Sequence, residues 1–329
     1  MMKHVSILVP AGEVSLIDIV GSYKAFKRVN QHLAAHGRAP LFTAQLVGTG
    51  QTQVVENGLF SIHPDADIRQ VQQTDLVIVP AISWNFEQSL AANRALLPWI
   101  VEQYHKGAEV ASMCIGGVLL AATGLLNGRR CSTHWMAADA FRRMFPDVEL
   151  VVEKLITDEH RIYTSGGAFS FVNLLLYLIE KYCDREMAIF CSKVFEVDID
   201  RNSQCAFTMF SGLKSHQDEA IKQAQLFIET HVNEKISMAE LAASLGLSRR
   251  NFDRRFIKAT YNTPLEYLQR VKIEAAKKAL ETSSLTVNEV MYGIGYTDLK
   301  TFREVFKKIT GLSPLEYRNK YNKEAVALL

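Results

Sequence analysis

Cys114 is the residue whose surroundings most clearly indicate chemistry. It follows an apolar strand expected at residues 109–113 and precedes a helix expected at 116–124. On such a strand-to-helix turn, a nucleophile elbow, the side chain is exposed, and the helix N-terminus lowers the pKa of a thiol and offers N–H groups to an anion. Asp18, at the end of the first strand–helix loop, and His134 are the candidate acid and base partners. The opposing interpretation is a structural thiol, since a buried free cysteine is more often inert.

Other residues lie where strands are expected to end. Trp84 follows the strand that ends at Pro80, and Ser165-Gly166-Gly167 precedes an apolar helix. Trp84 could offer a cation–π contact to a quaternary ammonium, or it could only cover the sheet. The Ser-Gly-Gly run could offer N–H groups to a carboxylate, or only form a turn, and His134 could be a packing residue. The candidate ligand-binding residues are Asp18, Trp84, Cys114, Ile115, His134, Ser165 and Gly166.

A second kind of chemistry is indicated by an internal repeat in the last third of the chain. Residues 260–267 recur 50 residues later at 310–317, and a pair of phenylalanines, Phe252 and Phe256, recurs as Phe302 and Phe306. Each copy predicts a helix, a glycine-bearing turn and a second helix, at 238–259 and at 287–309. Ser248 and Asp298 are good N-caps for the two second helices.

The two second helices should expose a basic face. The phenylalanine pairs are spaced i, i+4, so they share the buried face, and the cations lie opposite. A helix in the DNA major groove places side chains on base edges and flanking cations on phosphates. Solvated faces of an ordinary helical bundle are the alternative, although two copies in register argue against it. The candidate DNA-binding residues are Ser248, Arg249, Arg250, Asp253, Arg254, Arg255, Lys300, Thr301, Arg303 and Lys307.

The elements that must position these residues divide into two classes. In the first half, strands alternate with helices, which indicates an α/β, doubly wound, flavodoxin-like sheet that is mostly parallel. Beyond a polar stretch only helices are expected. We therefore predict a sensor domain at residues 1–197, a linker at 198–216 and an all-α domain with two helix-turn-helix units at 217–329.

Composition agrees with a two-domain protein. The 329 residues carry a formal charge of +2, but residues 218–322 hold 17 Lys+Arg against 13 Asp+Glu, or +4. The five cysteines are scattered without a Cys-x-x-Cys pair, which indicates reduced thiols and neither disulfides nor a zinc site. With no signal peptide and no apolar run long enough for a membrane helix, a cytoplasmic location is expected, with no membrane partner, cofactor or metal.

The second domain resembles the AraC/XylS family of bacterial regulators across residues 218–321. The motifs that carry the resemblance are Glu-Leu-Ala-Ala-Ser-Leu-Gly-Leu-Ser-Arg-Arg-Asn-Phe at 240–252 and Gly-Tyr-Thr-Asp-Leu-Lys-Thr-Phe-Arg at 295–303. The resemblance places base-facing positions at Arg250, Asp253, Arg254, Lys300, Thr301 and Arg303. Tyr261 stands where that family usually has glycine, and Glu304 where arginine is common.

The first domain resembles the ThiJ/PfpI superfamily, relatives of class I glutamine amidotransferases, over residues 4–195. The carriers are the opening Pro10-Ala-Gly with Leu-Ile-Asp-Ile-Val-Gly at 16–21, and the strand–Cys114–helix segment. Peptidase and deglycase branches place histidine after the cysteine, where this chain has Ile115, while Asp18 resembles the acid of the isonitrile-hydratase branch. The chain is similar to regulators that fuse both domains and sense small nitrogenous metabolites, which implies a pocket near Cys114.

Together these observations predict a transcriptional regulator that binds specific double-stranded promoter DNA and senses a small, nitrogenous effector. It is not expected to be an enzyme; a cysteine-dependent hydrolase or hydratase fused to a DNA-binding module is the alternative. A homodimer formed through the first domain is expected, and RNA polymerase is a further candidate partner.

Overall fold

The computed structural model describes residues 2–322 and divides between Gln204 and Cys205 into two compact units. The division lies inside the segment predicted as a linker. Each unit is described by itself. No helix in the described range is both long and apolar enough to cross a membrane.

The first unit is built on a seven-stranded sheet with the order β10-β11-β7-β6-β1-β2-β5. All neighbours are parallel except β10 and β11. Buried apolar runs form the central strands, as expected of a sheet covered on both faces. The strands are β1 (Lys3–Leu8), β2 (Phe42–Gly48), β5 (Ala66–Asp67), β6 (Leu76–Val79), β7 (Glu109–Ser112), β10 (Ile156–Glu159) and β11 (Ile162–Ser165). The predicted doubly wound α/β fold is confirmed.

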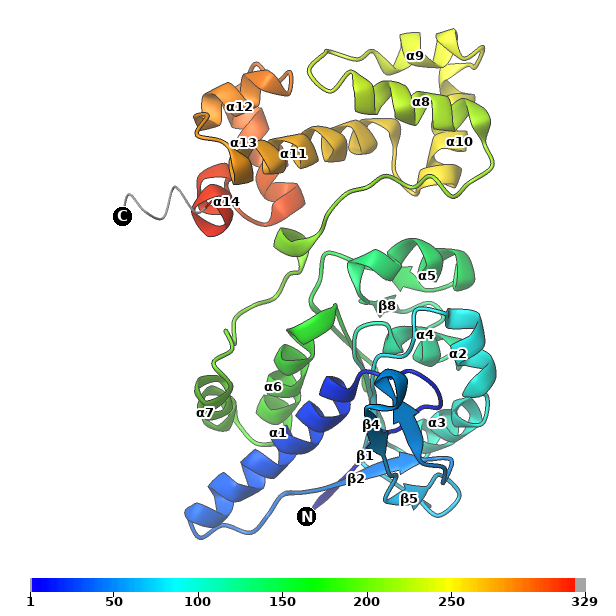
Figure 1. Cartoon of the computed structure of the whole chain (residues 1–329), viewed down its shortest axis with the longest axis vertical. Helices are drawn as coiled ribbons and strands as arrows, with labels where there is room; N and C mark the ends of the chain where they lie inside the picture. The colour runs from blue at the N-terminus through cyan, green and yellow to red at the C-terminus, as the bar shows by residue number, and fades with distance from the viewer. Residues whose placement is uncertain (1, 323–329) are drawn as a thin grey trace. The chain divides into compact units, whose positions relative to one another are not determined.

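Helices cover both faces of this sheet (Figure 1). One face packs against α1 (Leu16–Ala35), α6 (Phe171–Tyr182) and α7 (Arg185–Phe195). The other packs against α2 (Phe86–Ala92), α3 (Leu96–His105), α4 (Gly116–Ala122) and α5 (Ala138–Met144). The chain leaves β1 toward β2 on one side and meets β6 on the other. The carboxyl ends of β1 and β6 therefore form the switch point where doubly wound sheets bind ligands.

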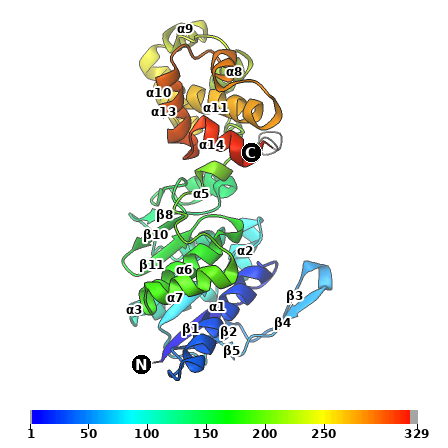
Figure 2. The ribbon, with the colours of Figure 1, turned by 90° about the vertical axis from the view of Figure 1, so that its left-hand side faces the viewer.

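Smaller elements lie outside the main sheet. A hairpin of β3 (Gln53–Val55) and β4 (Phe60–Ile62) extends away from the body of the first unit (Figure 2). A parallel pair, β8 (Arg130–Cys131) and β9 (Glu149–Leu150), lies before and after α5. The alternating pattern of the sequence predicts none of these short pieces.

The second unit is entirely helical within its described residues. Its helices are α8 (Glu219–Thr230), α9 (Met238–Ser244), α10 (Arg249–Thr260), α11 (Pro264–Thr282), α12 (Val287–Gly293), α13 (Leu299–Thr310) and α14 (Pro314–Tyr321). They form two cores, one around Phe252 and Phe256 and one around Phe302 and Phe306. The long helix α11 contributes to both cores, and in Figure 1 it runs from the helices of the first core to those of the second.

Candidate ligand site and candidate nucleic-acid interface

Cys114 occupies the turn between β7 and α4 in the strained geometry of a nucleophile elbow, with a φ of 53°. Its side chain is only 8% exposed. Backbone N–H groups of Ala168 and Ile115 favour the thiolate, but burial outweighs them and raises the pKa of Cys114 to about 11. The predicted lowering of this pKa by the helix N-terminus is therefore wrong, because desolvation is the larger effect.

Asp18 lies close enough to Cys114 for its charge to act on the thiol. It sits in the first turn of α1, where its N–H is capped by Ser15, and its Oδ2 accepts the N–H of Ala81 at 2.9 Å. Burial raises the pKa of Asp18 to about 6. The structure thus brings two of the three candidate catalytic residues, Cys114 and Asp18, together. Burial favours the neutral form of both side chains.

His134 is engaged elsewhere. Its Nδ1 accepts the N–H of Met136 at 3.1 Å, and its ring contacts Gly167 so closely that a methyl group there would overlap it. The ring also meets Trp84 edge to face, with centroids 5.6 Å apart. Burial lowers the pKa of the imidazole. Among the described residues, no hydrogen bond joins His134 to Cys114, so these side chains do not form a catalytic triad.

Three large apolar side chains are exposed beside this cluster. Trp84 is 52% exposed, Met136 59% and Phe169 71%. Each belongs to a segment that touches the cluster: Trp84 through His134, Met136 through its N–H, and Phe169 as the neighbour of Ala168. An exposed apolar patch beside polar groups, here His134 and Cys114, is a composition found at small-molecule sites.

The Ser165-Gly166-Gly167 run does not offer free N–H groups. The N–H of Gly166 donates to the carbonyl of Leu155 at 2.7 Å, and that of Gly167 donates to Oε1 of Gln204 at 3.4 Å. Ser165 is buried. The suggestion that the N–H groups of this run bind a carboxylate is therefore corrected, because Gly166 and Gly167 use theirs within the protein. Ile115 is also buried, and its backbone N–H hydrogen-bonds to the Cys114 thiol.

Gln204 is the residue that sequence reasoning missed. Its side-chain Nε2 donates to the carbonyls of Val152 at 2.6 Å and Thr133 at 2.9 Å, while Oε1 accepts from Gly167. The hydroxyl of Thr133 in turn donates to the carbonyl of Cys114 at 2.9 Å. A single buried amide therefore joins both loops that contact the cysteine. Nothing in the polar segment 198–216 marks this glutamine.

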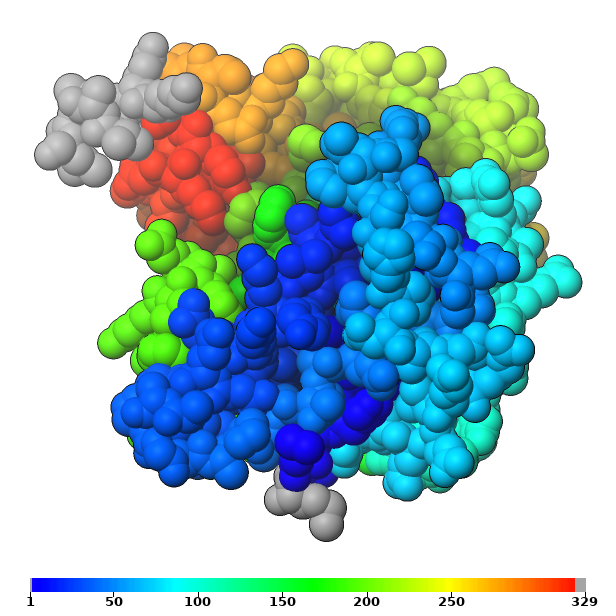
Figure 3. Space-filling view, turned by 60° about the horizontal axis from the view of Figure 1, so that its bottom comes forward, coloured from blue at the N-terminus to red at the C-terminus, as the bar shows by residue number. Residues whose placement is uncertain are grey.

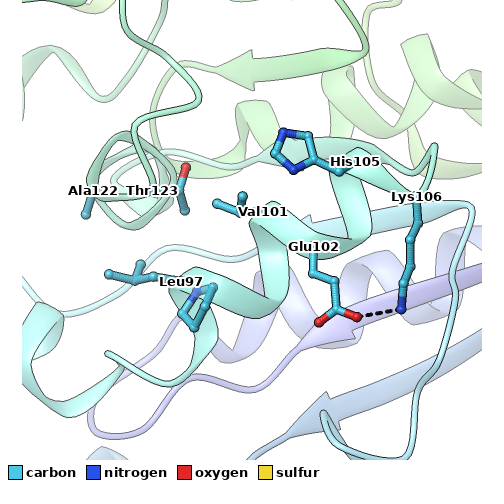
Figure 4. Close-up of a pocket in the computed structure, with 8 residues that line it drawn as sticks. Leu97, Val101, Glu102, His105, Lys106, Ala122 and Thr123 are labelled. Atoms are coloured by element: carbon cyan, nitrogen blue, oxygen red, sulfur yellow. Dashed lines mark ion pairs between the residues drawn. The ribbon is translucent and has the colours of Figure 1, made fainter.

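A separate groove of about 610 Å³ lies between α3 and α4 (Figure 4). Leu97, Val101 and Ala122 give it an apolar lining, and Glu102 pairs with Lys106 at its edge. None of the predicted ligand-site residues, all of which are described, lines this groove.

The second unit contains the two predicted helix-turn-helix units. Ser248 caps α10 by accepting the N–H of Asn251, and Asp298 caps α13 by accepting that of Thr301. Each phenylalanine pair is fully buried, and a tyrosine lies edge-on beneath it: Tyr267 at 5.3 Å from Phe256 and Tyr317 at 5.5 Å from Phe306. The repeated sequence thus forms repeated packing.

Most of the predicted DNA-binding side chains lie on the exposed faces of α10 and α13. Arg249 pairs with Asp253 at 2.8 Å and Arg254 donates to Asn251 at 3.0 Å, contacts that a nucleic acid could replace. The exposed set comprises Ser248, Arg249, Arg250, Arg254, Lys300, Thr301, Arg303 and Lys307, with Asp253 partly covered by its ion pair.

Arg255 is the exception. Its guanidinium makes a two-pronged ion pair with Asp218, the N-cap of α8, at 2.6 and 2.8 Å. It therefore fixes α8 to α10, and we withdraw it from the set predicted to contact DNA. The two family departures also differ in effect: Tyr261 takes the left-handed conformation (φ 53°) that Gly311 takes in the second copy, whereas Glu304 is simply exposed.

Comparisons with known proteins agree with both halves. Residues 3–181 match the DJ-1/PfpI family, and residues 241–320 match a helix-turn-helix domain. The chain is similar to the HTH-type transcriptional regulator GbdR of Pseudomonas aeruginosa, with 25% identity over 92% of this chain and 81% of the relative. CdhR of the same organism, also an HTH-type transcriptional regulator, is 26% identical over 83% and 80%.

A solved structure shows the same fold. A ThiJ/PfpI family protein from Pseudomonas syringae superposes with a TM-score of 0.51 and 17% identity, covering 74% of this chain and 88% of that one. The two predicted resemblances, to ThiJ/PfpI proteins and to AraC-type regulators, are confirmed by these matches.

Proposed function

This chain belongs to the DJ-1/PfpI family and carries an AraC-type helix-turn-helix domain, as transcriptional regulators do, and from this premise we propose that it reads specific promoter DNA under the control of a small nitrogenous metabolite. The observation that carries the proposal is the pair of capped, basic helices, α10 and α13, held in two matched cores. The relatives that match across both units are regulators by name, which favours a regulator over an enzyme.

The DNA-reading part of the proposal concerns Arg250, Arg254, Lys300 and Arg303. These side chains are exposed on the first two turns of their helices, the part of a reading helix that reaches base edges. An arginine that bonds guanine with two N–H groups gives about 1–3 kcal/mol of discrimination. Arg249 and Lys307 are suited to the phosphates on either side.

Selection from a random duplex pool tests this part. The full chain should enrich one sequence, and Arg254→Ala should weaken binding to it by about 5- to 150-fold, the range that 1–3 kcal/mol represents. Arg254→Lys keeps the charge but loses the fork, so it should lose sequence preference more than overall affinity. Lys278→Ala removes an exposed cation from α11 and serves as the control. Equal losses in Arg254→Ala and Lys278→Ala would contradict the proposal.

The ligand-binding part of the proposal concerns the cluster around Cys114. The buried carboxyl group of Asp18 would pair with a cationic nitrogen, and the exposed ring of Trp84 could lie against it. Cys114 then acts as a wall of the site, because the burial that raises its pKa disfavours the thiolate.

A thermal-shift screen of amino acids, betaines and polyamines tests this part. A ligand of the right class should raise the melting temperature of the first unit, and Asp18→Asn should remove the shift. Cys114→Ser should keep it. If no compound in the screen stabilises the unit, the sensing role loses its support.

Gln204 connects the two parts. It holds the Thr133 and Gly167 loops beside Cys114, and it is the last residue of the first unit. Only Cys205–Phe207 separate it from Thr208, whose carbonyl accepts from buried Lys277 of α11 at 2.6 Å. A ligand that shifts these loops therefore acts directly on the chain that enters the DNA-binding unit. Effectors work through such differences between two states, commonly 1–3 kcal/mol.

Gln204→Ala should leave DNA binding intact and remove its response to the effector. Gln73→Ala changes an exposed glutamine of the same unit and should respond normally. Retention of the full effector response in Gln204→Ala would exclude this connection while leaving the DNA-binding role untouched.

We further propose that the protein pairs through its first unit. The outer side of α1 exposes Ile17, Val20 and Tyr23, and the β3–β4 hairpin exposes Leu59 and Phe60. Both segments, in shades of blue, lie on the face drawn in Figure 3. Light scattering should give a dimer, and Val20→Asp should give monomers that still contain a folded first unit. A monomeric wild type would exclude this pairing.

A further inference from the structure

Helix α11 joins two separate cores, and one of its buried lysines, Lys272, lies where they meet. Tyr267 and Leu268 belong to the first core, whereas Ile273 and Leu280 belong to the second. Lys272, between these two groups, is only 6% exposed.

The ammonium group of Lys272 bridges the two helix-turn-helix units. Its Nζ donates to the carbonyl of Glu234 at 3.0 Å, in the segment between α8 and α9, beside the first helix-turn-helix motif. It also donates to the carbonyl of Ile294 at 2.9 Å, at the end of α12, in the turn of the second helix-turn-helix motif. The ring of Tyr296 lies beside it, with its centroid 5.6 Å from Nζ.

Backbone contact at Gly295 reinforces the bridge. This glycine has a φ of 73°, and a Cβ atom on it would lie 2.4 Å from the carbonyl oxygen of Asn233 and 2.9 Å from Nζ of Lys272. Only glycine lets the turn of the second helix-turn-helix motif approach the loop of the first motif so closely.

Burying a cation destabilises the folded state unless hydrogen bonds to the charged group offset the loss of water. Desolvation lowers the pKa of Lys272, and an apolar side chain in its place would leave two carbonyl oxygens without this donor. Buried polar groups of this kind can specify one arrangement among several that an apolar contact would accept. The two carbonyls belong to different halves of the repeat, so what Lys272 specifies is how those halves are oriented.

We propose that Lys272 is a positioning residue that fixes α13 relative to α10, and so sets the spacing between the two DNA half-sites that the protein accepts. The inference rests on the proposed DNA-binding function. One base pair added between half-sites turns the second by roughly 34°, since B-DNA has about 10.5 base pairs per turn. If the Lys272 bridge is rigid, this misfit weakens DNA binding. If the bridge is broken, the second helix-turn-helix motif can reorient to fit the altered spacing.

Lys272→Met is the central variant, because it keeps an unbranched side chain of nearly the same length and removes the ammonium group with its donors. Using the sequence selected by the wild-type full chain, binding is measured on that site, on sites with one base pair inserted or deleted between half-sites, and on a single half-site. We expect Lys272→Met to reduce the spacing penalty at least fivefold and to leave half-site binding unchanged. Lys272→Arg should restore the penalty, and Lys278→Met on the same helix should behave as the wild type.

Gly295→Ala attacks the same contact from the other side and should also relax the spacing. An unchanged spacing penalty in a folded Lys272→Met variant overturns the inference, as does an equal loss of half-site binding. If both variants lose their helical fold by circular dichroism, the contacts serve stability alone and the positioning role is wrong. If the wild type selects no sequence at all, the proposed function itself fails.

Discussion

Replacing Asp18 by asparagine should change the pH dependence of stability of the first unit in a calculable way. Burial raises the pKa of Asp18 from 3.8 to about 6. The shift of about two pKa units corresponds to roughly 3 kcal/mol, at about 1.36 kcal/mol per unit. Because the pKa of Asp18 is higher in the folded state than in the unfolded state, this group does not destabilise the first unit below about pH 4. The destabilisation grows as the pH rises and is complete once the pH exceeds about 6.

Between about pH 4.5 and 7.5 this carboxyl group should therefore cost the wild-type unit roughly 2 kcal/mol of its free energy of unfolding. Asparagine cannot ionise, and its amide oxygen can still accept the N–H of Ala81. The variant should lack this part of the slope and gain stability relative to the wild type as the pH rises. Other carboxyl groups of the unit, such as Asp67, titrate equally in both proteins and cancel in the difference.

The assay is sharp because of where the tryptophans lie. All three, Trp84, Trp99 and Trp135, belong to the first unit, so urea unfolding followed by tryptophan fluorescence reports that unit within the full chain. Asp147→Asn, which removes an exposed carboxyl group of the same unit, is the matched control. Parallel curves for the wild type and Asp18→Asn would refute the reasoning, since they would mean that Asp18 is solvated in the folded protein.

Three further predictions follow from the structure. Gly311→Ala should destabilise the second unit by about 1 kcal/mol, because a non-glycine residue is less stable by roughly that much in the left-handed conformation of Gly311 (φ 77°). An unchanged melting temperature in far-ultraviolet circular dichroism would contradict this prediction. Alkylation of Cys114, followed by peptide mapping, should accelerate about tenfold per pH unit from 7 to 9, as expected of a thiol whose pKa is about 11, and a plateau near neutrality would show the pKa to be low. Arg255→Ala and Asp218→Asn should each destabilise the second unit by less than about 1 kcal/mol, because they break the same partly exposed ion pair. If Arg255→Ala loses much more DNA affinity than Asp218→Asn does, Arg255 belongs to the DNA-binding set after all.

The features that the sequence predicts well are local and repeated. The cap Ser248, the buried pair Phe252 and Phe256 and the glycine turn lie within one short stretch, so side-chain spacing alone determines their geometry. The second copy of the pattern supplies an internal check. In the same way, the strand–Cys114–helix order predicts the elbow, because the turn is formed by neighbours in the chain.

The features that the sequence does not predict depend on distant partners. The helical segment after β6 is divided into α2 and α3 at buried Asn93, whose side chain bonds both the N–H and the carbonyl of Ala11. The pKa of Cys114 depends on how much protein covers it, which no local pattern records. Arg255 resembles its basic neighbours in sequence and differs from them only because Asp218 lies opposite.

The most consequential of these distant contacts share one chemical form. Gln204 and Lys272 are polar residues that a sequence pattern assigns to solvent, yet both are buried, and each uses one side chain to hold backbone groups from two separate segments. A long polar side chain suits this task because it reaches far and offers several hydrogen bonds, while its burial makes a wrong partner expensive. Gln204 joins two loops of the proposed sensor to the chain that leaves it, and Lys272 joins the two halves of the proposed reader. If a metabolite is to control DNA binding, rigid transmission is needed at both places, because a flexible joint at either one would absorb the 1–3 kcal/mol that an effector typically supplies.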